Sequence, residues 1–269
     1  MSLRIQNNVE AFNAHRQLVG SSHKLAKSME RLSSGYRINR AADDAAGLAI
    51  SEKLRGQIRG LSQAQRNAQD AVSMVQTAEG SLNEVHSMLQ RVRELAVQYK
   101  NGSLSTSDQG AITSEVKQLE AEIQRISGAA EFNGIKLLNG LGTVTFQVGA
   151  QDGQVITVST ATLYNGAIST AAFSLTAAGA TDIQEIDQAI DAVSAQRASF
   201  GAVQNRLEHT LHDLATYQEN LTASESRIRD VDMASEMVEF TKLQILQQAG
   251  VAMLAQAQQS PQSVLALLQ

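Results

Sequence analysis

IRGLSQAQRNAQDAVSMVQTAEGSLNEVHSMLQRVRELAVQYK, residues 58–100, decides the fold of this chain. Its apolar residues recur at steps of three, four and seven, and they are Leu61, Ala68, Val72, Val75, Leu82, Val85, Leu89, Val92, Ala96 and Tyr99. This heptad-like pattern predicts a single helix that packs along a partner helix. At about 1.5 Å per residue, the helix would be about 64 Å long. That length is typical of a rod and exceeds that of an ordinary globular helix.

Two further patterns supply partners for this helix. After the stop signal Asn101-Gly102, a second helix is predicted to begin at a cap near Ser107-Asp108 and to end at Gly128, antiparallel to the first. A third helix follows Thr181-Asp182, and its heptad residues are Ile183, Ile186, Ile190, Val193, Phe200, Leu207, Leu211, Leu214, Leu221 and Ile228. We therefore predict a mainly α fold, with a long coiled-coil helical rod formed by the N- and C-terminal segments.

The middle of the chain contains a small β region. Residues 143–148 and 154–158 alternate with period two, and the intervening GAQDG predicts a β-hairpin. Residues 161–180 are rich in Ala, Ser, Thr and Gly, which predicts a mobile surface loop. The Ser and Thr residues of 159–176 are candidates for O-linked sugar.

Both ends of the chain have helical patterns, although termini are normally where order fades. The apolar stripes of residues 3–32 and about 233–257 are expected to build an assembly, through Ile5, Val9, Phe12, Leu25, Met29, Leu32, Phe240, Leu243, Leu246, Met253 and Leu254. Ordering a residue costs roughly 1–2 kcal/mol, whereas a buried Leu-sized side chain returns about 1.5–3 kcal/mol. Two thin helices are therefore expected to be loose in a monomer and ordered in an assembly.

Composition narrows the classes of function. A net charge of −5 and a pI of about 5.6 argue against a nucleic-acid binder, which would have a basic patch. The absence of Cys excludes disulfides and thiolate catalysis. No apolar run approaches transmembrane length, and the N-terminus lacks the apolar core of a cleaved signal peptide. Membrane insertion is not expected, and any export would use a route without a cleaved signal.

No residue pattern predicts catalysis, a metal or a cofactor. His209 and His212 are three residues apart on one helix face, but no metal-binding motif accompanies them. His86 is isolated in the sequence. Packed or solvated histidines are the expected reading, and no enzyme activity is predicted.

The segment near Asp43 and Asp44 is expected to be a structural connector. Adjacent carboxylates point in different directions on a helix, which is unfavourable for a catalytic pair. Ion pairs with the nearby Arg37 and Arg40 are expected to stiffen this connector.

Five motifs resemble those of bacterial flagellins. They are LSSGYRINRAADDAAGLAIS at 32–51, QRVRELAVQ at 90–98, EFNGIKLLNG at 131–140, SRIRDVDMASEM at 226–237 and ILQQAGVAMLAQAQQSPQSVLALL at 245–268. The resemblance covers roughly residues 1–160 and 183–268, in order. It implies an extracellular filament subunit that polymerises with itself for motility. The span where flagellins often carry an outer domain is short, so such a domain is expected to be missing or vestigial.

The resemblance also implies a division of the chain. Residues 1–44 and 226–269 would form an inner-tube helical domain. Residues 45–180, with the hairpin and loop, and 181–225 would form the surrounding rod.

Further partners follow only from the resemblance. Animal Toll-like receptor 5 would contact Arg91, Leu95 and Glu115, although Leu95 could equally be rod core and the two charged residues could serve subunit packing. An export chaperone would bind the C-terminal helix, and hook–filament junction and cap proteins would meet the filament. Three alternatives are a junction protein of the same superfamily, a helical hydrolase or metalloprotein, and a cytosolic coiled-coil scaffold.

Overall fold

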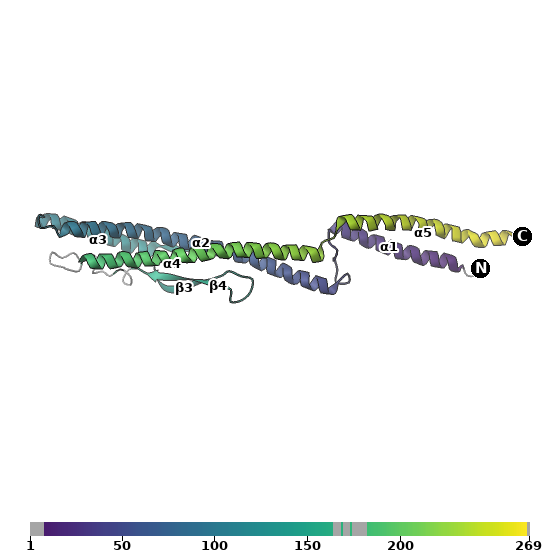
Figure 1. Cartoon of the computed structure of the whole chain (residues 1–269), viewed down its shortest axis with the longest axis horizontal. Coiled ribbons are helices and arrows are strands. Elements are labelled where there is room, and N and C mark those ends of the chain that lie inside the picture. Colours follow the sequence, from purple (N-terminus) through teal and green to yellow (C-terminus); the bar gives the residue numbers. More distant parts are fainter. Residues whose placement is uncertain (1–7, 164–167, 169–172, 174–181, 268–269) are drawn as a thin grey trace. The chain divides into compact units, whose positions relative to one another are not determined.

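The structure is a computed structural model that describes residues 8–163, 168, 173 and 182–267 (Figure 1). The chain divides into two compact units. Unit 1 contains residues 1–56 and 220–269, and unit 2 contains residues 57–219. The two longest helices, α2 (Ala45–Tyr99) and α4 (Asp182–Arg229), contribute residues to both units.

Unit 2 has a core in which α2, α3 (Thr106–Ala129) and α4 pack along their lengths (Figure 1). Ion pairs report the antiparallel pairing of α2 with α4. Arg93 Nε lies 2.6 Å from Asp187 Oδ1, and Arg197 Nη2 lies 3.8 Å from Glu79 Oε1. The heptad prediction is confirmed, because the buried side chains of α2 include Leu61, Val75, Leu82, Val85, Leu89, Val92 and Ala96.

The start of α3 differs by two residues from the prediction. The N-cap is Ser105, not Ser107, and the Ser105 hydroxyl accepts the backbone N–H of Asp108 while the Asp108 carboxylate accepts the backbone N–H of Ser105. This reciprocal capping box satisfies two otherwise unpaired donors. Ser105, Thr106 and Ser107 are all common N-cap residues, so residue type alone did not identify the cap. The reciprocal bonds identify it as Ser105.

The predicted hairpin is confirmed as β3 (Asn139–Gln147) and β4 (Val155–Thr162), which pair antiparallel with Val144 opposite Val158. The inward residues Val148 and Ile156 join Ala68, Ala71 and Leu207 in a second part of the core. A shorter hairpin, β1 (Glu131–Phe132) and β2 (Ile135–Lys136), was not predicted. Its turn places Asn133 at φ 49° and Gly134 at φ 79°, which suits Asn-Gly in a two-residue hairpin loop.

The prediction of a mobile surface loop at 161–180 falls mostly outside the described residues. The few described residues of this segment contradict the predicted surface position. Leu163, Ile168 and Phe173 are buried and pack into the core of unit 2. The prediction rested on the many small and polar residues of the segment. It overlooked these three large apolar side chains, because their five-residue spacing matches no helix or strand period.

Unit 1 pairs α1 (Val9–Ser34) with α5 (Met233–Leu267), as predicted for the two ends (Figure 1). The helices are antiparallel, because the start of α1 meets the far part of α5. Asn8 Nδ2 donates to the Ala257 carbonyl at 2.7 Å, whereas Arg31 Nη1 lies 3.5 Å from Glu236 Oε2. Gly35 ends α1 at φ 75°, a conformation that favours glycine.

Candidate functional site

The α1–α5 pair exposes most of the large apolar side chains that reach solvent in the described chain. From the predicted set, Phe12 is 70% exposed and Met253 is 64% exposed. Val9, Met29 and Leu246 are also exposed. Leu25, Leu32, Phe240 and Leu254 are partly buried, Leu243 is buried within unit 1, and Ile5 lies outside the described residues.

Several exposed apolar residues lie outside the set expected for assembly. They are Val19 on α1, Ile50 on α2, and Met233, Met237, Val238, Ile245 and Val251 on α5. The available signal was that α5 carries apolar residues around its whole circumference, so a single stripe describes it poorly. We refer to the exposed apolar side chains of α1 and α5 together as the apolar surface of unit 1.

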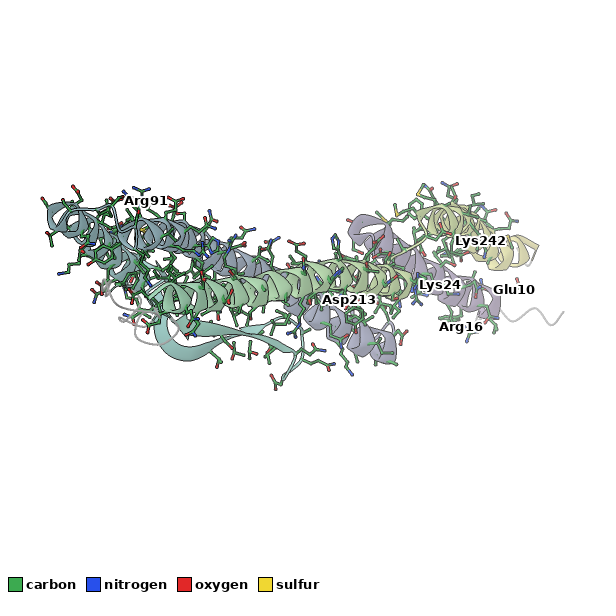
Figure 2. The ribbon with its side chains drawn as sticks, turned by 60° about the vertical axis from the view of Figure 1, so that its left-hand side comes forward. Glu10, Arg16, Lys24, Arg91, Asp213 and Lys242 are labelled. Carbon is green, nitrogen blue, oxygen red and sulfur yellow. The ribbon has the colours of Figure 1, made fainter. Side chains whose placement is uncertain are left out.

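A groove of about 670 Å³ lies between α1 and α5. Its apolar lining comes from Ala14 on α1 and from Leu246, Ala249, Gly250 and Met253 on α5. Glu10, Asn13, Gln17 and Gln256 supply polar groups to the same groove. Figure 2 shows charged side chains of the two helices, including Glu10 on α1 and Lys242 on α5. The groove therefore combines an apolar lining with charged and amide groups.

The connector between α1 and α2 is structural, but the expected ion pairs were wrong. Asp43 Oδ1 lies 2.6 Å from Lys27 Nζ, and Asp43 Oδ2 accepts the backbone N–H groups of Asn39 and Arg40, each at 3.1 Å. These interactions hold the pKa of the Asp43 carboxyl well below its usual range, the Lys27 bond contributing most. Asp44 instead accepts the backbone N–H of Gly47 at 2.9 Å.

The two arginines of this connector have other partners. Arg40 Nε lies 3.0 Å from Glu30 Oε1, and the Arg37 guanidinium donates to the Ile228 carbonyl at 2.6 Å. Neither partner could be read from sequence spacing, because Ile228 is distant in the chain and Glu30 lies within α1, on the other side of the turn that ends this helix. The two carboxylates therefore have different roles. Asp43 forms an ion pair with Lys27, and Asp44 caps the start of α2.

The second connector, between α4 and α5, lies against the first. The Arg229 carbonyl accepts the backbone N–H of Arg37 at 2.7 Å, and the Gly35 carbonyl accepts that of Val231 at 3.0 Å. The Arg229 guanidinium lies over the Tyr36 ring, 4.9 Å from its centroid, and 2.7 Å from Glu52 Oε1. We call these contacts between 35–38 and 228–231, with Glu52, the connector clasp.

The three residues of the predicted receptor site lie together in unit 2. The Arg91 side chain projects from α2 (Figure 2), and its Nη2 lies 3.0 Å from Glu115 Oε1 on α3. Bonds from Glu115 first and then Glu94 raise the pKa of Arg91. Leu95 is 2% exposed and belongs to the core. The ion pair is therefore accessible from solvent, whereas Leu95 is not.

The described residues offer neither a metal site nor a membrane span. No group of three or more His, Asp or Glu side chains among them is placed to hold a metal ion. Within the same residues, none of the helices combines the length and apolar character needed to span a membrane.

Helices packed along their length, together with a helix pair that exposes much apolar surface, define a structural protein that associates with other chains. The bacterial flagellin N-terminal helical region matches residues 5–143, and the bacterial flagellin C-terminal helical region matches residues 183–268. The chain belongs to the bacterial flagellin family. It is a structural subunit of the flagellar filament, which is extracellular, and not an enzyme.

Individual relatives match along nearly the whole chain. A flagellin of Halalkalibacterium halodurans is 54% identical over 272 residues, covering 98% of this chain and 99% of the relative. A flagellin of Bacillus subtilis is 49% identical over 303 residues, covering 99% and 100%. A crystal structure of Bacillus cereus flagellin superposes with a TM-score of 0.50 at 31% identity, over 55% of this chain and 88% of that chain. The resemblance read from the five motifs is confirmed.

Proposed function

We propose that this chain polymerises through the apolar surface of unit 1 and that the resulting filament serves motility. The observation that carries the proposal is the contrast between the two units. Unit 2 buries an extensive apolar core, whereas unit 1 buries few apolar side chains and exposes many. Exposed apolar surface of this extent marks an interaction site, and further copies of the chain would bury it.

Seeded polymerisation tests this proposal. Burying a Phe-sized side chain contributes about 1.5–3 kcal/mol, so Phe12→Ser should raise the critical concentration about tenfold or more. The matched control is Val155→Ser, which removes an exposed apolar side chain from β4 in unit 2. Microscopy and sedimentation of seeded solutions measure both variants. Equal critical concentrations for Phe12→Ser and the parent would count against the proposal.

We also propose that unit 1 segments form the inner tube of the filament and that the remaining helices form the rod around it. The domain limits 1–44, 45–180, 181–225 and 226–269 belong to this proposal. Its support is the family membership and the all-round apolar character of α5, which suits a helix surrounded by neighbours.

Recognition of the monomer by Toll-like receptor 5 is a second part of the proposal. The exposed Arg91–Glu115 pair offers a charged surface held by a hydrogen-bonded ion pair. Arg91→Ala is expected to abolish receptor signalling by the monomer. Arg125→Ala is the matched control, because Arg125 is also exposed and pairs with Glu122 on its own helix. Full signalling by Arg91→Ala would contradict this part.

An export chaperone is expected to cover α5 before assembly, because an exposed apolar helix must not polymerise early. Export without a cleaved signal peptide, and contacts with hook–filament junction and cap proteins, complete the proposal. Calorimetric titration of a purified flagellar chaperone with the full chain, and with a chain lacking 233–269, tests the first point. Equal affinity for both chains would exclude α5 as the binding segment.

A further inference from the structure

The packing of α5 on α1 does not by itself fix how the two helices are aligned. Leu243 is the only apolar side chain of the two helices that is buried, among residues whose burial is described. Val238 and Ile245 point to solvent and are equally apolar. Because α5 is apolar all round, a rotation or a one-turn slip of about 5.4 Å would bury a comparable area. Alignment therefore requires contacts that are specific to position.

Such contacts are polar and occur at both ends of the pair. At the outer end, Asn8 Nδ2 donates to the Ala257 carbonyl at 2.7 Å. At the inner end, Arg31 lies 3.5 Å from Glu236. Hydrogen bonds have narrow limits of length and angle, so a slip of one turn would break each of them.

The connector clasp adds a third constraint. Arg229 has a side chain only 12% exposed, held between the Tyr36 ring and the Glu52 carboxylate. Its backbone carbonyl accepts the Arg37 N–H, so both parts of Arg229 hold the first connector. A cation over an aromatic ring is more favourable where water is largely excluded, as it is around Arg229, whereas the Glu52 carboxylate is half exposed.

Almost no residues separate the connector clasp from the ends of α1 and α5. Helix α1 ends at Ser34, immediately before Gly35, and α5 begins at Met233, immediately after Asp232. The Asp232 carboxylate accepts the backbone N–H of Ala234 at 3.0 Å, so this last residue is also fixed. A displacement at the clasp is therefore transmitted directly to the start of α5.

We propose that the connector clasp and the Asn8–Ala257 bond fix the axial alignment of α5 on α1. Arg229, Tyr36 and Asn8 are then positioning residues for self-association. They determine which apolar side chains unit 1 presents to the next copy, and they need not touch that copy. This inference rests on the proposed polymerisation through unit 1.

Disulfide mapping reads the alignment directly, because the chain has no Cys of its own. A Cβ at Gly250 would lie 3.9 Å from the Leu18 Cβ, within the range of about 3.5–4.5 Å for a disulfide. The pair Leu18→Cys/Gly250→Cys therefore reports the observed alignment. The pairs Leu18→Cys/Leu254→Cys and Leu18→Cys/Leu246→Cys report a slip of one turn in either direction.

Each pair is placed in the full chain, in filaments grown from wild-type seeds, with the clasp intact or carrying Arg229→Gln or Tyr36→Leu. The intact clasp should give the 18–250 disulfide and little of the other two. Either clasp variant should raise the yield of a slipped disulfide at least about fivefold, the population change for roughly 1 kcal/mol. The control Arg227→Gln should behave as the parent, because Arg227 is exposed and bonds Ser224 on its own helix.

The possible outcomes distinguish a failure of the alignment role from a failure of the proposed polymerisation. Filaments from both clasp variants that contain only the 18–250 disulfide would overturn the alignment role and leave polymerisation intact. Failure of both variants to polymerise, with Arg227→Gln polymerising normally, would also overturn it. The inference predicts that the clasp variants still pair α5 with α1, but in a slipped alignment. Failure of the intact-clasp parent to polymerise would instead refute the proposed function.

Discussion

Arg91 and Leu95 lie one helical turn apart on α2, yet their surroundings give them different roles. The Arg91 side chain is half exposed and bonds Glu115, whereas Leu95 is buried in the core of unit 2. An exposed ion pair contributes little to stability, but a buried leucine contributes much. The proposed receptor site includes both residues, and the structure separates their energetic roles.

Stability measurements on the monomer should show this separation. Leu95→Ala is expected to lower the free energy of unfolding by about 2–5 kcal/mol, because it removes a buried side chain and leaves a cavity. Arg91→Ala should change it far less. Urea unfolding followed by circular dichroism measures both, and equal losses for the two variants would contradict the assignment. Loss of receptor signalling in Leu95→Ala must be interpreted with this stability in view.

The depressed pKa of Asp43 predicts a dependence on pH. A carboxyl whose pKa is lower in the folded than in the unfolded state stabilises the fold above the unfolded pKa of about 3.9. That contribution decreases as the pH falls below about 4 toward the folded pKa. Asp43→Asn should therefore lower the temperature at which filaments dissociate at pH 7, and the gap to the parent should narrow at pH 3.

Light scattering during heating measures these dissociation temperatures. The exposed Asp191, on α4 in unit 2, supplies the control variant Asp191→Asn, for which little change is expected at either pH. A gap between Asp43→Asn and the parent that stays constant from pH 7 to pH 3 would show that the Asp43 charge has no part in it.

At the scale of elements, the local patterns were sufficient to find each long helix, but not each end or connection. The heptad found α2 because Leu82, Val85 and Leu89 alternate between steps of three and four, and all are buried. The cap of α3 was placed two residues late, since Ser105 and Ser107 are equally good capping residues by type. The buried residues Ile168 and Phe173 were missed, because their five-residue spacing matches no helix or strand period.

The capping box of α3 supplies an element-scale prediction. Ser105→Ala removes the hydroxyl that accepts the Asp108 N–H, and should lower the free energy of unfolding by about 1 kcal/mol. Ser103→Ala is the control, because Ser103 is exposed and lies outside α3. Urea titration of the monomer compares the two. A loss in Ser103→Ala as large as that in Ser105→Ala would mean that the hydroxyl bond is not the cause.

At the scale of the whole molecule, the two units differ in how they are stabilised. Unit 2 has a core that is complete within one chain, centred on α2, α3 and α4. Unit 1 holds α1 and α5 through polar contacts and a thin apolar seam, so it gains less free energy per ordered residue. Order in unit 1 should therefore depend on neighbouring copies, whereas order in unit 2 should not.

Amide hydrogen exchange tests this dependence. In a dilute monomer, amides of α1 and α5 should exchange within seconds to minutes, whereas those of α2 near Val85 should be protected by many orders of magnitude more. Polymerisation should raise protection in α1 and α5 and change the core of unit 2 little. Strong protection at both ends of a dilute monomer would sink this prediction.

The sequence by itself determined the helices, the buried face of the rod and the family. These properties repeat locally, since each apolar residue is read against neighbours three, four or seven positions away. Only the tertiary structure decided that Arg229 meets Tyr36 and Glu52, that Arg37 bonds the end of α4, and that Leu163 is buried. Such contacts join segments far apart in the chain, and their geometry depends on how whole helices are aligned. A local sequence period carries no information about that alignment.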